Sequence, residues 1–143
     1  MGNEIIARKL YQIQKLLKEL RADLGNSKED FLADRHKVGT AERNFQLIVN
    51  LAIDINGIII TSQDNNIPDT YQQSFLELGK NKLIDRETAR FLAESAKLRN
   101  ILVHEYNFDD DPSKFYDSAK RMIPVYEQYV KAIFKYTETK RPK

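Results

Sequence analysis

The sequence predicts an all-α fold: an up-and-down bundle of about five helices in one domain spanning residues 1–143. Apolar residues recur three and four positions apart through most of the chain, and no long stretch alternates apolar and polar residues as a half-exposed strand would. The composition, 41% hydrophobic and 31% charged, is ordinary for a globular protein. A chain of this length can bury roughly 68–70% of its unfolded surface, enough for a core of its own.

The first helix is predicted from a single apolar stripe with helical spacing. Its members are Ile6, Leu10, Ile13, Leu17, Leu20 and Leu24. Gly25 and Asn26 are typical of a helix end, and Ser27 is suited to cap the segment that follows, with Asp30 three residues further on.

Helical periodicity resumes at residue 29 and continues to about residue 61, with a break expected near residues 37–40. Residues 45–60 are apolar almost all round, which predicts a buried central helix. Polar residues and a proline at 62–69 predict a loop, and residues 70–81 predict a short helix.

The fourth helix is expected to start after an N-cap at Asp85 and to run to about Tyr106. Three aspartates and a proline at 109–112 predict a loop that opens the last helix, because proline suits the first helical position. We expect that helix to bend near Pro124 and to leave a loose tail at 138–143. Its core face is predicted to carry Phe115, Ala119, Met122, Tyr126, Tyr129, Ile133 and Tyr136.

The composition excludes several kinds of chemistry and indicates the cellular compartment. The chain has no cysteine, which excludes disulfides, thiolate metal sites and cysteine nucleophiles. It shows no cluster of metal ligands, and no cofactor is expected. The N-terminus lacks a signal-peptide pattern and no apolar run approaches about 20 residues, so we expect a cytoplasmic protein. Net charge is only +2, from 23 basic and 21 acidic residues, so any contact with RNA is expected to be local.

One stretch combines the residue types of a catalytic site: RNILVHEY, from Arg99 to Tyr106. Five residues of ideal helix amount to about 500°, so Arg99 and His104 are expected about 140° apart around the axis. To act on one phosphate, either the helix must bend between them or a second chain must complete the site.

The run resembles the R-x4-H-x-Y signature of the HEPN superfamily, with Arg99, His104 and Tyr106 at the three positions. The likeness to its HepT toxins extends from about Ile5 to Tyr106, through the segments EDFLAD, AERNFQLIVNLAIDINGIII and TYQQSFLELGKNKLID. The resemblance implies a homodimer whose two motifs face one cleft and cleave RNA without metal, with tRNA ends as one possible target.

The same resemblance implies a partner and a switch. HepT toxins are encoded beside a minimal nucleotidyltransferase antitoxin (MNT), which is thought to silence them by adding AMP to the motif tyrosine, here Tyr106. Family descriptions also point to a polar residue on the second long helix, for which Asp54 is the candidate.

The residue types fit this chemistry. The 2′-hydroxyl of RNA can attack its own phosphodiester, so the protein need supply no nucleophile. His104 can move protons near neutral pH, and Arg99 can stabilise a phosphate whose charge grows in the transition state. Asn100 can orient the phosphate or a base, and Tyr106 can stack on a base.

Each of these residues also has a plainer interpretation. His104 can be a helix-end histidine stabilised by the helix dipole, Arg99 an ordinary ion-pair partner and Tyr106 a packing residue. Asp54 lies in a very apolar segment, so it must either pair, with Arg99 as a candidate, or face a cleft. His36 is expected on the surface.

Two other functional classes stay open at this point. The bundle can be a non-catalytic nucleotide- or partner-binding subunit of a minimal nucleotidyltransferase, in which Arg99 and His104 bind without breaking a bond. It can also be a purely structural helical adaptor, in which both residues matter only for stability.

Overall fold

The computed structural model describes residues 2–63, 66–104 and 111–139, and within these ranges it contains six α-helices and no strand. The all-α prediction is confirmed, but the number of helices is six, because the second predicted segment divides in two. The helices are α1 (Gly2–Leu24), α2 (Lys28–Ala33), α3 (Arg35–Ser62), α4 (Tyr71–Lys80), α5 (Arg86–His104) and α6 (Pro112–Thr139).

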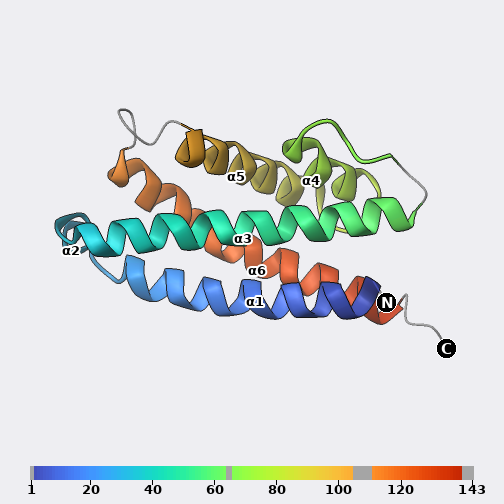
Figure 1. The fold of residues 1–143 in the computed structure, drawn as a ribbon, viewed down its shortest axis with the longest axis horizontal. Coiled ribbons are helices and arrows are strands. Elements are labelled where there is room, and N and C mark those ends of the chain that lie inside the picture. Colours follow the sequence, from blue (N-terminus) through green and yellow to red (C-terminus); the bar gives the residue numbers. More distant parts are fainter. Residues whose placement is uncertain (1, 64–65, 105–110, 140–143) are drawn as a thin grey trace.

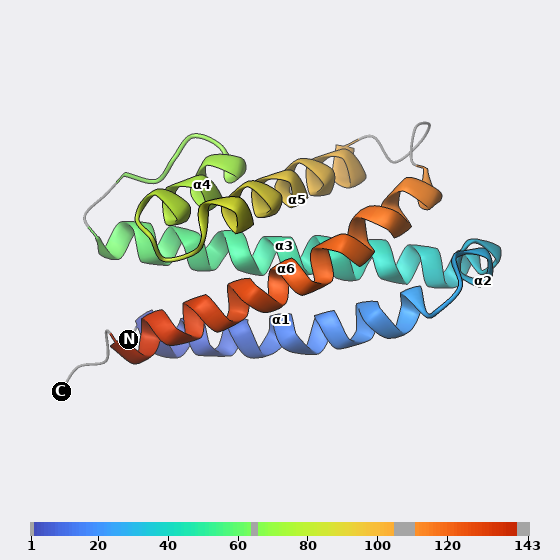
Figure 2. The ribbon, with the colours of Figure 1, turned by 180° about the vertical axis from the view of Figure 1, so that it is seen from behind.

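α3 runs through the middle of the bundle, with α1 along one side and the α4–α5 pair along the other (Figure 1). Seen from behind, α6 crosses the bundle diagonally (Figure 2). Its first turn lies near the C-terminal end of α5, and its last turn lies beside the N-terminal end of α1. The six predicted stripe residues of α1 are all buried. The predicted face of α6 is buried as well, except for Tyr136, which is half-buried.

The break in the second helical segment lies at Asp34 and not at residues 37–40. Asp34 leaves the helical region, with φ −112° and ψ 96°, and its carboxylate accepts hydrogen bonds from the backbone N–H groups of His36 and Lys37. An aspartate at this position satisfies two of the four free N–H groups at a helix start, so α3 begins afresh there.

The other predicted helix ends are confirmed. Gly25 closes α1 with a φ of +60°, which glycine adopts without strain, and the Ser27 hydroxyl accepts from the backbone N–H of Asp30. Thr70 caps α4, and α5 starts directly after Asp85. Residues 138 and 139, predicted to belong to the loose tail, are the last two residues of α6. The rest of that tail and the predicted end of α5 near residue 106 lie outside the described residues.

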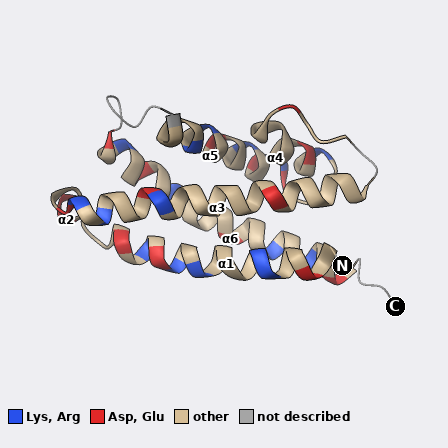
Figure 3. Cartoon of the chain, viewed as in Figure 1, with Lys and Arg blue, Asp and Glu red and all other residues tan. Residues whose placement is uncertain are grey.

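α3 is the most apolar helix of the bundle. Residues 44–62 carry one ionisable side chain, Asp54, and Figure 3 shows this half of α3 almost free of charge. By length and hydropathy alone α3 would pass for a membrane span, contrary to the expectation that no run is long enough. Its place between α1 and the α4–α5 pair explains the composition, since a central helix meets neighbours on several sides.

One buried polar triad and one buried polar pair tie the helices together inside this apolar core. The fully buried Asn56 of α3 donates from Nδ2 to Ser74 Oγ of α4 at 3.1 Å, and its Oδ1 accepts from the Tyr129 hydroxyl of α6 at 2.6 Å. The Tyr126 hydroxyl lies 2.7 Å from Ser95 Oγ of α5. Buried polar groups that all find partners favour one packing of the helices over others.

Candidate functional site

Arg99 occupies the point where α5 faces both α3 and α4. Its half-buried guanidinium donates from Nε to Asn50 Oδ1 of α3 at 2.8 Å and from Nη1 to the neighbouring Asn100 Oδ1 at 3.1 Å. On another side, Arg99 Cζ lies 5.7 Å from the centre of the Tyr71 ring at the start of α4. Three helices therefore hold one cation in place.

The partners of Arg99 among the described residues are neutral. Both hydrogen bonds end on amide oxygens, and none of the ion pairs within residues 2–63, 66–104 and 111–139 includes Arg99. A guanidinium has five N–H donors, so two bonds leave donors for an incoming ligand. A fixed, partly desolvated arginine whose described partners are both amide oxygens is suited to bind a phosphate.

Asn50 and Tyr71 are the two residues of this site that the sequence analysis missed. Asn50 had a signal: it is one of few polar side chains in an apolar helix, four residues before Asp54. Tyr71 had none, because only the packing of α4 on α5 brings it to Arg99.

Asp54 does not pair with Arg99. It lies one turn further along α3, where its carboxylate is 3.3 Å from Lys9 Nζ of α1, and its side chain is 59% exposed. An exposed pair of this kind contributes only about 0–1 kcal/mol to stability. Of the two alternatives expected for Asp54, the structure therefore shows pairing, but with Lys9 and not with Arg99. A role for Asp54 in the site stays a prediction.

α5 continues without interruption from Arg99 to His104, its last residue. Arg99 and His104 therefore lie about 140° apart around the axis of one continuous helix. The expected alternative of a break in the helix between them does not apply. The His104 side chain and the whole of Tyr106 lie outside the description, so their predicted roles stay predictions.

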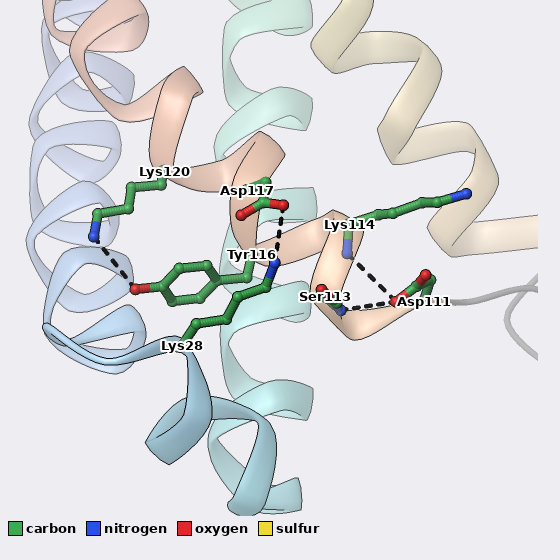
Figure 4. Close-up of polar contacts among 7 residues, drawn as sticks. All are labelled: Lys28, Asp111, Ser113, Lys114, Tyr116, Asp117 and Lys120. Atoms are coloured by element: carbon green, nitrogen blue, oxygen red, sulfur yellow. Dashed lines mark hydrogen bonds and ion pairs between the residues drawn. The ribbon is translucent and has the colours of Figure 1, made fainter.

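The first turn of α6 brings a further cation, Lys114, to the end of the bundle where α5 ends (Figure 4). Asp111 caps α6 by accepting from the backbone N–H groups of Ser113 and Lys114, directly before Pro112, the predicted first residue of the helix. In Figure 4 the Lys114 side chain extends toward α5.

The ring of Tyr116, also in this first part of α6, lies between two lysines. Lys28 Nζ is 6.0 Å and Lys120 Nζ 5.3 Å from its centre, and Lys28 also pairs with Asp117 at 2.9 Å. The surface around Tyr116 is therefore basic, but Asp117 neutralises the charge of Lys28.

One hollow of the described surface lies at the α4–α5 turn and the end of α6, and its lining includes Lys82, Arg86 and Lys135. The part of the chain that the structure describes contains no group of three or more histidine, aspartate or glutamate side chains that could hold a metal ion. His36, predicted on the surface, is exposed.

Known proteins resemble this chain in sequence and in fold. The profile of the family described as "Ribonuclease HepT-like" matches residues 10–133. The tRNA nuclease HepT of Aphanizomenon flos-aquae is 35% identical over 135 residues, which cover 94% of this chain and 91% of that protein. The mRNA nuclease HepT of Shewanella oneidensis is 31% identical over 104 residues, 73% of this chain and 77% of that protein.

The fold is also that of a toxin solved with its antitoxin. The tri-AMPylated Shewanella oneidensis HEPN toxin, in complex with MNT antitoxin, superposes with a TM-score of 0.81 at 25% identity, covering 92% of this chain and 97% of that chain.

Proposed function

The chain belongs to the HepT-like ribonuclease family, and from that premise we propose that it is the toxin of a toxin–antitoxin pair, a metal-independent endoribonuclease that acts through Arg99 and His104. The observation that carries the proposal is the Arg99 guanidinium, fixed by Asn50 and Asn100 and left without a carboxylate among the described residues. The resemblance to HepT toxins in the sequence is confirmed by the family match.

The reaction needs only groups that RNA and this chain possess. The 2′-oxygen attacks the adjacent phosphorus, the O2′–P bond forms, and the P–O5′ bond breaks. His104 takes the proton from the 2′-hydroxyl and returns it to the leaving 5′-oxygen. Arg99 binds the non-bridging phosphate oxygens, whose charge grows in the transition state. Asn100 helps to orient the phosphate.

Two copies of the chain are proposed to share the site. Arg99 and His104 diverge around an unbroken helix, so a second α5 facing the first can bring one chain's arginine to the other's histidine. α5 also carries exposed apolar side chains on one face: Phe91 is 43% and Ile101 37% exposed, with the partly buried Leu98 between them. An apolar stripe of this kind is typical of a surface that another chain covers.

We propose that the nuclease is regulated at the motif near the end of α5. An MNT-type nucleotidyltransferase antitoxin is the proposed partner, and AMP added to Tyr106 would place a bulky anion beside the phosphate site and repel RNA. Asp54, exposed one turn from Asn50, is proposed as a supporting residue of the shared cleft. The proposed compartment is the cytoplasm, where RNA and antitoxin are available.

The test compares the two histidines of the chain. Wild type, His104→Ala and the control His36→Ala are expressed without antitoxin, shown by mass spectrometry to be unmodified at Tyr106, and incubated with total RNA in EDTA. Growth arrest and RNA cleavage are expected from wild type and His36→Ala but not from His104→Ala. Cleavage by a folded His104→Ala protein would refute the assignment.

Arg99→Lys, with the exposed Arg90→Lys on the same helix as its control, tests the phosphate clamp in the same assay. Cleavage is expected to fall only for Arg99→Lys. If unmodified wild type leaves RNA intact but still binds a nucleotidyltransferase, the chain is instead a non-catalytic binding subunit.

A further inference from the structure

Tyr71 combines exposure with a fixed position. It is the first residue of α4, it is 48% exposed, and the centre of its ring is 5.7 Å from Arg99 Cζ. The core aromatic residues that pack on α4 and α5, such as Tyr126 and Tyr129, are at most 1% exposed, so Tyr71 is not part of the core.

The backbone under Tyr71 is anchored to the centre of the bundle. Its carbonyl oxygen accepts a 2.7 Å hydrogen bond from Ser74 Oγ, and Ser74 Oγ in turn accepts from the buried Asn56 Nδ2. Asn56 is held by the Tyr129 hydroxyl, and the Thr70 hydroxyl caps the same turn of α4. The polar chain that joins α6, α3 and α4 therefore ends at Tyr71.

The anchoring fixes the start of α4, and with it the backbone of Tyr71, against the core of the bundle. An aromatic ring beside an arginine is the combination with which proteins bind single-stranded RNA: the arginine binds phosphate and the ring stacks on a base. The guanidinium contacts Tyr71 without covering it, since about half of the residue remains accessible.

We propose that Tyr71 is the base-stacking residue of the site and holds the nucleobase next to the phosphate bound by Arg99. The inference rests on the proposed function, because it takes the ligand of Arg99 to be RNA. It assigns single-stranded RNA as the substrate form, because a base within a duplex is already stacked on both faces and offers no free face to the ring. The ring, and not its hydroxyl, carries the interaction.

The chain contains no tryptophan, so the substitution Tyr71→Trp introduces a single tryptophan fluorophore at this position. Tyr11→Trp is the matched control, since Tyr11 is 68% exposed on α1, across α3 from α4 (Figures 1 and 2). The probe is a fully 2′-O-methylated single-stranded oligonucleotide of about 12 nucleotides, which cannot be cleaved because it has no free 2′-hydroxyl. As the oligonucleotide is added, stacking is expected to quench the tryptophan emission of the Tyr71→Trp protein and to leave that of the Tyr11→Trp protein unchanged.

Binding of the same probe to ring-less variants supplies the second readout. Tyr71→Leu keeps an apolar side chain without a ring and is expected to weaken binding about 5- to 150-fold, whereas Tyr71→Phe restores it to within about threefold. Unquenched emission of the Tyr71→Trp protein, together with full affinity of Tyr71→Leu, would overturn the proposal. That result is distinct from failure of the proposed function, in which wild type cleaves no RNA whether or not the Tyr71→Trp protein is quenched.

Discussion

Replacing Asn50 by aspartate changes the charge beside Arg99 while keeping the shape of the side chain. The Oδ1 atom that accepts from Arg99 Nε at 2.8 Å becomes part of a carboxylate. The new ion pair is half-exposed, so it is expected to raise the free energy of unfolding by no more than about 1 kcal/mol. Stability is therefore expected to hold or rise slightly.

Activity is expected to change in the opposite direction. A phosphate on the free edge of the guanidinium would lie roughly 7 Å from the new carboxylate, and at an effective dielectric constant of about 20 the repulsion is about 2 kcal/mol. Since about 1.4 kcal/mol corresponds to a factor of ten, RNA cleavage should fall roughly 30-fold.

The assay is cleavage of RNA in EDTA under single-turnover conditions, with thermal unfolding measured on the same preparations. Asn26→Asp, at an exposed position in the turn after α1, controls for the change in net charge. An Asn50→Asp protein that is folded and cleaves RNA at the wild-type rate would refute the idea that Arg99 binds the scissile phosphate.

Two further predictions concern the core. A Cβ added at Gly79 of α4 would lie 2.7 Å from Ala89 Cβ of α5, so Gly79→Ala should lower the free energy of unfolding by about 1–3 kcal/mol, and Ala89→Gly in the same chain should recover part of the loss in urea denaturation. Burial raises the pKa of Tyr126 and Tyr129 above 10 in the folded state, so above pH 10 the unfolded chain releases protons that the folded chain keeps. The free energy of unfolding should therefore fall as the pH rises above 10, by up to about 1.4 kcal/mol per pH unit for each of the two tyrosines. The fall should be less steep in Tyr126→Phe, and equal slopes for wild type and this variant would contradict the prediction.

The helices were predictable because their signals are local. Gly25, Ser27 and Pro112 mark helix ends through backbone preference and side-chain caps that act within four residues, and all three ends are where the sequence predicts them. The break at Asp34 also has a local cause, the capping carboxylate, but the prediction placed the break at 37–40.

The candidate site was predictable only as a list of residue types. The RNILVHEY run identifies Arg99 and Asn100, and the structure places these two side chains in contact. The run does not indicate which residues of other helices contact Arg99 and Asn100. Asn50 and Asp54 are both polar residues of the same apolar helix, about 40° apart around its axis, and the sequence does not distinguish them.

The sequence by itself determined that this chain is helical, where most helices begin, which faces are buried and which motif it carries, because these depend on neighbours three or four positions away. The tertiary structure alone decided that Arg99 bonds to Asn50 and contacts Tyr71, while Asp54 pairs with Lys9 of α1. Those contacts join residues far apart in the chain, and they depend on how α3, α4 and α5 are rotated and seated against one another, which packing of the whole core sets.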